Sequence, residues 1–194
     1  MMARSIVNRN LVKIVKLQLA AIEIVLSRMD QTASDRLIEM ILQADKIFVT
    51  GQGRSGLVAQ CLATRLAQMG FDVHIPGQAT CQKIEPSDLL IAFSCRGTTT
   101  TTVEFARVSR RVGAKIAAVT AFGESTLAEL ADQVVLIPSD DQDIRSRCRY
   151  IIGPNNNTLF EQAALLYADT LVCILLEQKG TSKNIINQHH TNLE

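Results

Sequence analysis

The fold is decided by residues 46–56, which read KIFVTGQGRSG. A short run rich in β-branched and aromatic residues ends at Thr50 and is followed at once by a G-x-G-x-x-G pattern. This order predicts a buried strand, a tight turn and the first turn of a helix. Such a turn directs backbone amides and the Ser55 hydroxyl toward an anion at the helix N-terminus, and a single phosphate group suits it.

Strand and helix patterns alternate outward from this stretch. Apolar periodicity predicts further strands at 72–75, 89–93, 115–120 and 133–137, and helices at 8–29, 32–44, 55–69, 99–112 and 159–179, with a short tail helix after Gly180. Thr32 or Ser34 is expected to cap the second of these helices. Strands that alternate with helices form a parallel sheet covered on both faces. The predicted fold class is α/β, a single doubly wound parallel sheet flanked by helices in a flavodoxin-like, three-layer sandwich.

The length of 194 residues suits one domain with one hydrophobic core. We expect a single domain over 1–194, divided into N-terminal helices (1–44), an α/β core (45–138), a mobile loop (139–157) and C-terminal helices (158–194). The segment 139–157 is polar and has almost no apolar periodicity. Its position before a long helix predicts a lid.

Charge and cysteine usage exclude several classes of function. The 20 basic and 19 acidic residues leave a net charge of +1, so there is no global electrostatic footprint for nucleic acid. No run reaches the roughly 18 uncharged apolar residues that a membrane span requires. The five cysteines are dispersed and contain no C-x-x-C pair, which fits a reducing compartment. We expect a cytoplasmic protein without a nucleic-acid or membrane partner.

The glycine pattern also has to be compared with a dinucleotide site. That fingerprint needs an acidic residue at the carboxyl end of the second strand, where it binds ribose. Here Asp72 lies at the start of the expected second strand, and the far end reads HIPG at 74–77. The ribose partner is missing, so the turn is predicted to bind one phosphate instead. For Ser55 the alternative remains that it only caps the helix.

A second loop, residues 94–99 with the sequence SCRGTT, also sits between a strand and a helix. Loops that follow parallel strands meet at one edge of the sheet, so the two loops can converge on one phosphate. The Arg96 guanidinium would add a charged group that can bind phosphate through two N–H donors, although Arg96 can also be a solvated surface arginine. The predicted phosphate-binding residues of the two loops are Gly53, Arg54, Ser55, Ser94, Arg96 and Thr99.

Together these features resemble the sugar isomerase (SIS) domain family, and within it the 6-phospho-3-hexuloisomerases. The resemblance covers nearly the whole chain. It is carried by GQGRSG at 51–56, RL at 65–66, GF at 70–71, DLLI at 88–91, GAK at 113–115, TLFE at 158–161 and HTNLE at 190–194. Only the LFE and HTNLE segments separate this branch from other SIS domains.

The resemblance implies an enzyme that interconverts D-arabino-hex-3-ulose 6-phosphate and D-fructose 6-phosphate through an enediol. It implies a phosphorylated sugar as substrate, no metal and no cofactor, and a homotetramer or dimer with shared active sites. The second loop departs from the family's usual Ser-Gly-Ser-Gly-Glu-Thr at Cys95, Arg96 and Thr98. Arg96 either compensates with a bidentate phosphate contact or selects a different anion. An isomerase of another phosphosugar is therefore an alternative, and so is a sensor that binds without turnover.

Moving a carbonyl group between adjacent carbons requires a base and an acid. The resemblance assigns these roles to Glu161 and His190. From the residues alone, Glu161 could instead complete a capping box with Thr158, and His190 could be a surface residue of a frayed terminus. His74 is expected to be structural, and Cys95 is assigned no catalytic role.

Two features predict an oligomer. The first helix, 8–29, carries an apolar arc wider than one packing face needs, which leaves a surface for a neighbouring subunit. The helix at 159–179 would carry the chain roughly 30 Å away from Glu161. The tail that follows looks helical and is too short to return easily. His190 is therefore expected to reach the active site of a neighbouring subunit.

Overall fold

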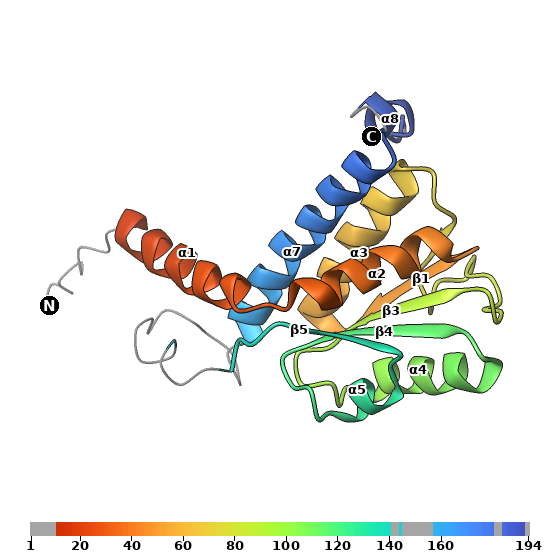
Figure 1. Cartoon of the computed structure of the whole chain (residues 1–194), viewed down its shortest axis with the longest axis horizontal. Helices are drawn as coiled ribbons and strands as arrows, with labels where there is room; N and C mark the ends of the chain where they lie inside the picture. Colours follow the sequence, from red (N-terminus) through yellow and green to blue (C-terminus); the bar gives the residue numbers. More distant parts are fainter. Residues whose placement is uncertain (1–10, 141–143, 145–156, 181–183, 193–194) are drawn as a thin grey trace, which may run out of the picture.

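The computed structural model describes residues 11–140, 144, 157–180 and 184–192 (Figure 1). Its centre is a five-stranded sheet in which every strand pair is parallel and the order is β2-β1-β3-β4-β5. The strands are β1 (Ile47–Gly51), β2 (Val73–His74), β3 (Leu89–Phe93), β4 (Lys115–Thr120) and β5 (Gln133–Leu136). The predicted α/β fold is confirmed. Most of the expected mobile loop at 139–157 lies outside the described residues.

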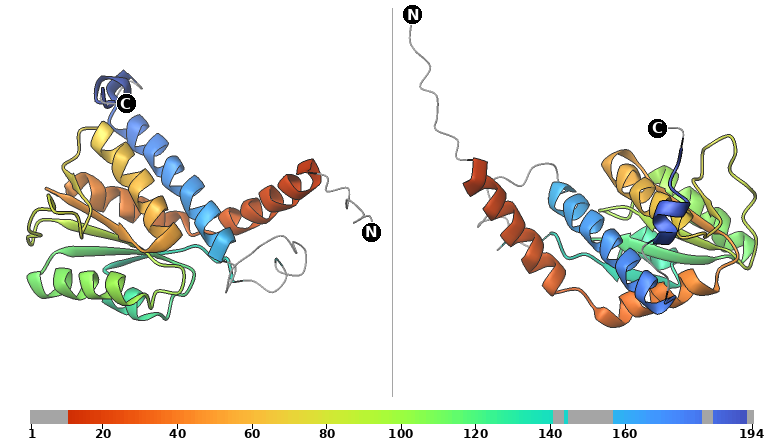
Figure 2. Two further views of the ribbon diagram at one scale, coloured as in Figure 1. Left: turned by 180° about the vertical axis from the view of Figure 1, so that it is seen from behind. Right: turned by 90° about the horizontal axis from the view of Figure 1, so that it is seen from above.

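Helices cover both faces of this sheet, as the doubly wound prediction requires (Figure 2). On one face lie α2 (Gln31–Gln43), α3 (Gly53–Gln68) and α7 (Asn157–Gln178), and α1 (Leu11–Ser27) packs against α7. The other face packs on α4 (Thr100–Val112) and α5 (Thr126–Leu130). The short helix α8 (Asn184–Gln188) lies beyond the carboxyl end of α7 and beside α3 (Figure 1).

The central strands are buried on both faces, which explains why they read as continuous apolar runs. Alternate side chains point to opposite faces of a strand. In β1, Val49 joins the core beneath α3 and α7, whereas Phe48 joins the core beneath α4. In β3, Ile91 and Leu90 divide in the same way. One chain segment thus supplies both hydrophobic layers.

The direction of the chain across the sheet reverses at β1, because β2 and β3 lie on opposite sides of it. The strands β1 and β3 end together, with Gly51 paired opposite Phe93. In open parallel sheets such a reversal leaves a crevice outside the carboxyl ends of the strands, and ligands bind there. The topology therefore places both sequence-predicted loops at one crevice.

The glycines of the first loop are required by the close approach of β1 to α3. A Cβ atom on Gly51 would lie 2.8 Å from the Ser55 carbonyl oxygen, and one on Gly56 would lie 2.8 Å from the Gly51 carbonyl oxygen. Both distances are shorter than real Cβ contacts. The pattern thus has a packing cause, which is independent of any bound nucleotide.

Two expected helix starts are wrong by a few residues. The cap of α2 is Asp30, whose carboxylate accepts a hydrogen bond of 2.9 Å from the Thr32 amide, so Thr32 and Ser34 lie inside the helix. Helix α7 begins at Asn157, so Thr158 is a residue of its first turn. Thr158 therefore cannot be the cap residue, and the capping-box alternative for Glu161 is wrong.

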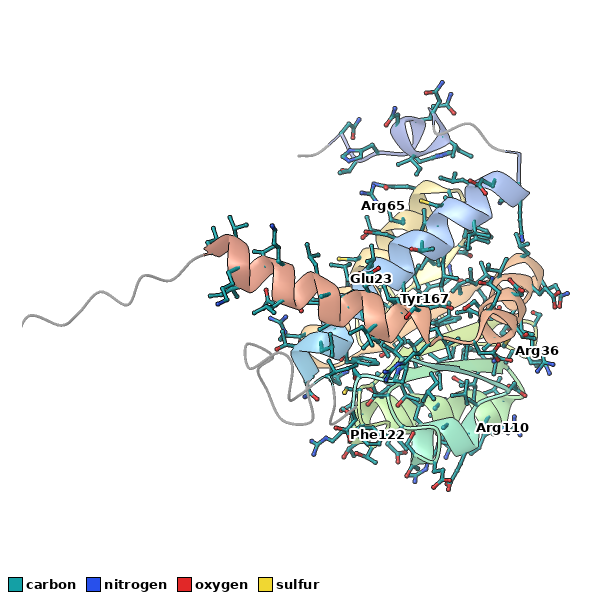
Figure 3. All side chains as sticks on the ribbon, turned by 60° about the vertical axis from the view of Figure 1, so that its left-hand side comes forward. Glu23, Arg36, Arg65, Arg110, Phe122 and Tyr167 are labelled. Atoms are coloured by element: carbon teal, nitrogen blue, oxygen red, sulfur yellow. The ribbon has the colours of Figure 1, made fainter. Side chains whose placement is uncertain are left out.

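Helix α1 is packed only along part of its surface. Ala21, Ile22 and Val25 are buried, whereas Leu11 is 73% exposed and Leu19 is 57% exposed. The N-terminal half of α1 projects away from the rest of the chain, with side chains on every side of it (Figure 3). The N-terminal part of the wide apolar arc predicted for this helix is therefore left uncovered in the single chain.

Helix α7 is long and apolar enough to cross a membrane by length and composition alone. However, 61% of its most apolar window is buried inside the protein. It lies against both α1 and α3. This burial is the pattern of a core helix, and the criterion itself is weak evidence when one helix meets it.

Candidate active site

The two predicted loops lie side by side at the crevice of the sheet. The first, residues 51–56, connects β1 to α3, and the second, residues 94–99, connects β3 to α4. The pairing of β1 with β3 runs from Ile47 opposite Leu89 to Gly51 opposite Phe93, so both loops leave the sheet at the same level. We refer to them as the glycine turn and the hydroxyl loop.

The hydroxyl loop is held in shape by its own side chains. The Ser94 hydroxyl oxygen accepts a hydrogen bond of 3.1 Å from the Gly97 amide and lies 3.0 Å from the Thr99 hydroxyl. From outside the loop, the Thr120 hydroxyl donates to the Cys95 carbonyl at 3.0 Å. Ser94 is buried and Thr99 is exposed, so the hydrogen bonds of the buried Ser94 hold Thr99 in place at the surface.

The start of α4 lies at the surface end of this loop. Its cap residue, Thr99, makes no side-chain hydrogen bond to the helix, because its hydroxyl is directed to Ser94. The first-turn amides of a helix have no partner within the helix itself and favour anions. This arrangement leaves the predicted phosphate position open.

Helix α3 begins at Gly53, and its cap residue is Gln52, which makes no side-chain capping bond. Ser55 therefore lies inside the first turn, and the alternative in which Ser55 caps the helix is wrong. Its side chain is largely buried and makes no hydrogen bond with the residues that the structure describes. Phosphate binding by Ser55 stays a prediction.

The structure brings Glu161 to the glycine turn. Glu161 lies just after the first turn of α7, and its carboxylate Oε2 accepts a hydrogen bond from the Nε of Arg54. The Glu161 side chain is 9% exposed, whereas that of Arg54 is 63% exposed. The predicted base is thus a nearly buried carboxylate, and its cationic partner faces the solvent side of the site.

Cys95 belongs to the hydroxyl loop, and its thiol is close enough to Glu161 to feel the charge of that carboxylate. Burial raises the pKa of the Cys95 thiol to about 12, and the negative charges of Glu161 and Asp140 act in the same direction. A hydrogen bond with Ser139 and the charge of Arg96 oppose this shift of the pKa. The thiol therefore stays protonated at neutral pH, which agrees with the prediction that it has no catalytic role.

Arg96 is exposed on the hydroxyl loop, and within the described part of the chain it has neither a hydrogen bond nor an ion pair. A guanidinium in this position has its full set of donors available for an anion. The structure does not decide between a phosphate contact and a solvated arginine. Its role therefore stays a prediction.

A cleft of about 410 Å³ opens beside the glycine turn. Its walls come from the end of β1, the first turns of α3, the segment after β2 and the start of α4. The polar side chains that line it include Gln52, Gln78 and Thr101, and none of the described residues in its walls is charged. A cleft of this size with amide and hydroxyl groups has room for an uncharged polyol chain.

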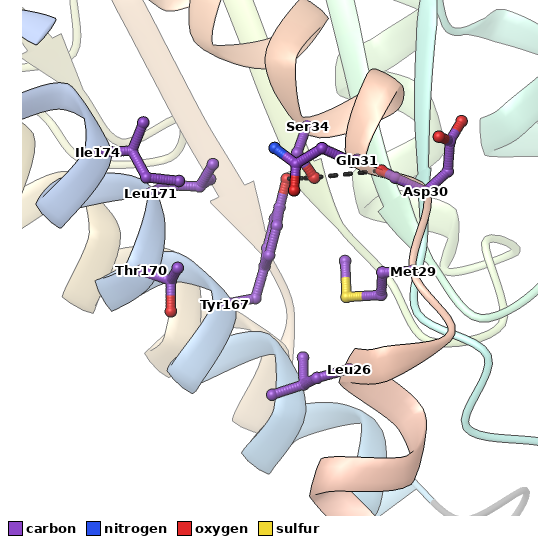
Figure 4. A pocket seen from close by; sticks show the side chains of 9 residues that line it. All are labelled: Leu26, Met29, Asp30, Gln31, Ser34, Tyr167, Thr170, Leu171 and Ile174. Atoms are coloured by element: carbon purple, nitrogen blue, oxygen red, sulfur yellow. Dashed lines mark hydrogen bonds between the residues drawn. The ribbon is translucent and has the colours of Figure 1, made fainter.

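A second cavity, of about 170 Å³, lies between the end of α1, the start of α2 and α7 (Figure 4). Its lining includes Leu26 and Tyr167, and the Tyr167 hydroxyl donates to the Ser34 hydroxyl at 3.2 Å. Burial raises the pKa of Tyr167 to about 12. None of the predicted site residues lines this cavity, whereas Gly53 lines the cleft beside the glycine turn, so we assign the active site to the crevice.

His190 does not meet Glu161 within the chain. It is exposed just beyond α8, whereas Glu161 lies at the opposite end of α7 (Figure 1). From Glu161 to the end of α7 the helix advances about 26 Å. His74 has a structural environment, as predicted, because its ring lies 3.0 Å from the Asp72 carboxylate and packs on Phe48.

No group of three or more histidine, cysteine or acidic side chains that could hold a metal ion occurs in the described residues. The site is therefore built from a carboxylate, hydroxyls, backbone amides and arginines. These groups can bind an anion and transfer a proton.

The family follows from a comparison with known proteins. The model of the SIS domain matches residues 40–166, a range that contains the glycine turn, the hydroxyl loop and Glu161. The chain belongs to the SIS domain family. The resemblance drawn from the sequence is therefore confirmed at the level of the family, whereas His190 lies outside the matched range.

Named relatives of this SIS domain support a finer placement. The 3-hexulose-6-phosphate isomerase of Bacillus subtilis (strain 168) is 35% identical over 161 residues, which are 83% of this chain and 86% of the relative. The enzyme of the same name from Mycobacterium gastri is 35% identical over 158 residues, 81% of this chain and 78% of the relative.

A solved structure agrees with this placement. A hypothetical protein from Methanococcus jannaschii, for which a molecular function of 3-hexulose-6-phosphate isomerase was inferred, superposes with a TM-score of 0.79 at 26% identity. The match covers 94% of this chain and 98% of that chain.

The ion pair between Arg54 and Glu161 could not be foreseen from the sequence. The two residues are separated by 107 positions, and no periodic pattern links them. The order of β1 and α3 in the sequence places Arg54 at the crevice. Only the packing of α7 beside α3 in the structure brings the start of α7, with Glu161, to the same place.

Proposed function

We propose that this SIS domain is a phosphosugar isomerase that interconverts D-arabino-hex-3-ulose 6-phosphate and D-fructose 6-phosphate. The observation that carries the proposal is the nearly buried Glu161 carboxylate, held by Arg54 beside two loops suited to a phosphate group. The names of the curated relatives support the choice of substrate. The enzyme is expected to be cytoplasmic and to require neither metal nor cofactor.

The two sugars differ only in which of two adjacent carbons bears the carbonyl group. A base removes the proton from C2 of the hexulose, and the electron pair of that C–H bond forms the C2–C3 double bond of an enediol. The proton is then delivered to C3 while the hydroxyl proton on O2 is lost and C2 becomes the carbonyl carbon. Oxidation of C2 balances reduction of C3, so no external electron acceptor is needed.

Glu161 is the proposed base, and the phosphate group is held by the hydroxyl loop and the glycine turn. His190 of a neighbouring subunit is the proposed acid that moves protons between O2 and O3. His190 is exposed beyond α8, and the length of α7 separates it from Glu161 of the same chain. This position supports the proposal that His190 serves the active site of a neighbouring subunit. The uncovered apolar arc of α1 is the proposed subunit surface of a homotetramer or dimer.

Turnover is tested by incubating the purified protein with fructose 6-phosphate in deuterated water and following the sugar by NMR. We expect a second ketose to appear and deuterium to enter at C3. Deuterium at C1 would instead indicate an aldose–ketose isomerase of the same sugar. Saturable binding without any exchange would identify a sensor and contradict the proposal.

The shared site is tested by complementation. Glu161→Gln and His190→Gln are prepared separately, shown to be folded and inactive, then unfolded together and refolded as a mixture. Mixed oligomers would contain some sites with both native residues, so part of the activity should return. Mixed oligomers that stay inactive would show that the two residues do not meet across a subunit boundary.

A further inference from the structure

Arg54 links the proposed base to the open part of the site. Its Nε donates to Glu161, and the side chain is 63% exposed although its partner is 9% exposed. A guanidinium carries five N–H donors, of which one is on Nε. The terminal amino groups of Arg54 have no hydrogen bond with any residue in the described ranges. The four donors on the terminal amino groups therefore remain available, and most of them point away from the carboxylate.

Stability alone does not explain this pair. Ion pairs between exposed groups contribute little to folding, whereas a buried charge is destabilising when it loses its partner. The contact between α3 and α7 is made by buried apolar side chains, among them Leu62 and Leu66 of α3 and Ala164 of α7. The two helices thus share an apolar contact that does not involve Arg54, and the exposure of its guanidinium calls for another explanation.

A role as the main phosphate ligand also fits poorly. The charge of Arg54 is already matched by a carboxylate, so a phosphate would have to compete with Glu161 for it. Arg96, in contrast, is exposed on the hydroxyl loop without an ion pair among the described residues. Of the two arginines, Arg96 is the one whose charge is free to attract a phosphate group.

We propose that Arg54 is a catalytic residue that holds Glu161 through Nε and hydrogen-bonds the substrate carbonyl oxygen through its terminal amino groups. The inference rests on the proposed function. In the reaction the C–H proton passes to Glu161, the C–H electron pair forms the carbon–carbon double bond, and the carbonyl π pair moves to the oxygen.

The charges explain why this position favours catalysis. Before proton transfer the positive charge of Arg54 faces the carboxylate. As Glu161 accepts the proton it becomes neutral, while the substrate oxygen gains the negative charge. The cation therefore keeps a negative partner throughout, and its interaction with the substrate is strongest in the transition state. The donors are in place beforehand, because the pair with Glu161 fixes the guanidinium.

The test uses Arg54→Ala and Arg54→Lys, with Arg65→Ala as the matched control on the same helix. The Arg65 side chain bonds Gln68 near the far end of α3 and lies outside the proposed site. For each variant, kcat and KM for fructose 6-phosphate and the inhibition constant of inorganic phosphate are measured, and circular dichroism checks folding. Guanidinium chloride at millimolar concentration is then added to Arg54→Ala.

Arg54→Ala should lower kcat by about 100-fold to 1,000-fold, as removal of a donor to a developing oxyanion does. KM and the inhibition constant of phosphate should stay within about threefold, since the phosphate ligands are untouched. Arg54→Lys should fall between Arg54→Ala and the unmodified protein, and free guanidinium should restore part of the kcat of Arg54→Ala. The control should match the unmodified protein.

Several outcomes would overturn the inference. A rise in KM and in the phosphate inhibition constant with kcat retained would make Arg54 a phosphate ligand. If Arg54→Ala does not fold, an Arg54→Lys variant with unchanged kcat decides against the inference. Turnover by the unmodified protein with kcat indifferent to Arg54 removes this inference alone, whereas no turnover by the unmodified protein removes the proposed function with it.

Discussion

The glycine turn and the hydroxyl loop occupy equivalent positions after neighbouring strands, yet they are built in different ways. The glycine turn is shaped by close backbone packing of β1 against α3, and its side chains are left to point elsewhere. The hydroxyl loop is shaped by its own side chains, because the Ser94 hydroxyl holds both Gly97 and Thr99. In the glycine turn the Arg54 side chain is therefore available to bond Glu161, whereas in the hydroxyl loop the Ser94 and Thr99 side chains are used to hold the shape of the loop.

This difference suggests a division of labour. A loop that is rigid and rich in hydroxyls suits an unreacting phosphate, which has to be held in one place. A loop whose side chain reaches the base suits the reacting carbons. Substitutions in the hydroxyl loop should accordingly alter folding and KM, and substitution of Arg54 in the glycine turn should alter kcat. The predictions below test this contrast.

The largest effect is expected from a glycine in each loop. Gly97 has φ 64° and a Cβ atom there would lie 1.9 Å from the Ser125 hydroxyl oxygen, whereas Gly53 has φ 57° and open space around it. Gly97→Ala should cost about 3 kcal/mol or more of unfolding free energy, from overpacking added to backbone strain. Gly53→Ala should cost about 1 kcal/mol, from the left-handed backbone alone. Urea denaturation measures both, and equal losses would contradict the contrast.

A second contrast concerns thiol reactivity. With a pKa of about 12, Cys95 is almost wholly protonated at pH 8, while the exposed Cys61 of α3 is not buried in this way. A pKa raised by about three units lowers the thiolate fraction about a thousandfold at that pH. Iodoacetamide at pH 8 should therefore modify Cys61 long before Cys95, as peptide mass spectrometry can follow. Comparable rates at the two cysteines would show that Cys95 is accessible and ionised.

The third contrast compares the two arginines of the loops. Arg96→Ala should raise KM for fructose 6-phosphate by about 10-fold to 100-fold, the range expected for a charge-assisted hydrogen bond. Its kcat should change little, which is the reverse of the result expected for Arg54→Ala. Steady-state kinetics with inorganic phosphate as a competitive inhibitor measures the difference. Unchanged KM and unchanged phosphate affinity would make Arg96 a solvated surface residue.

Features set by neighbouring residues could be predicted from the sequence, whereas a contact between residues far apart in the sequence could not. The strands at 89–93 and 115–120 match the expectation to the residue, because strands buried on both faces leave a continuous apolar run. The cap of α2 was missed, because Asp30 competes with nearby Thr32 and Ser34 for the same role. The pair of Arg54 with Glu161 depends on packing between α3 and α7, which no local pattern encodes.

The smallest effect is expected from Ser55→Ala, and it isolates ligand binding most cleanly. The Ser55 hydroxyl has no hydrogen bond with any described residue, so its removal leaves no protein group unpaired and should change the unfolding free energy by less than about 0.5 kcal/mol. Thr99 lacks this property, because its hydroxyl also supports Ser94.

If the Ser55 hydroxyl binds the phosphate group, its loss should raise KM about fivefold, which corresponds to one hydrogen bond. Ser109→Ala is the matched control, since this serine is also buried but donates to the Phe105 carbonyl at 2.9 Å within α4. The control should lower the melting temperature slightly and leave KM unchanged. A lowered melting temperature with unchanged KM for Ser55→Ala would instead make Ser55 a structural residue, and the phosphate would then depend on the hydroxyl loop and the backbone amides of the glycine turn.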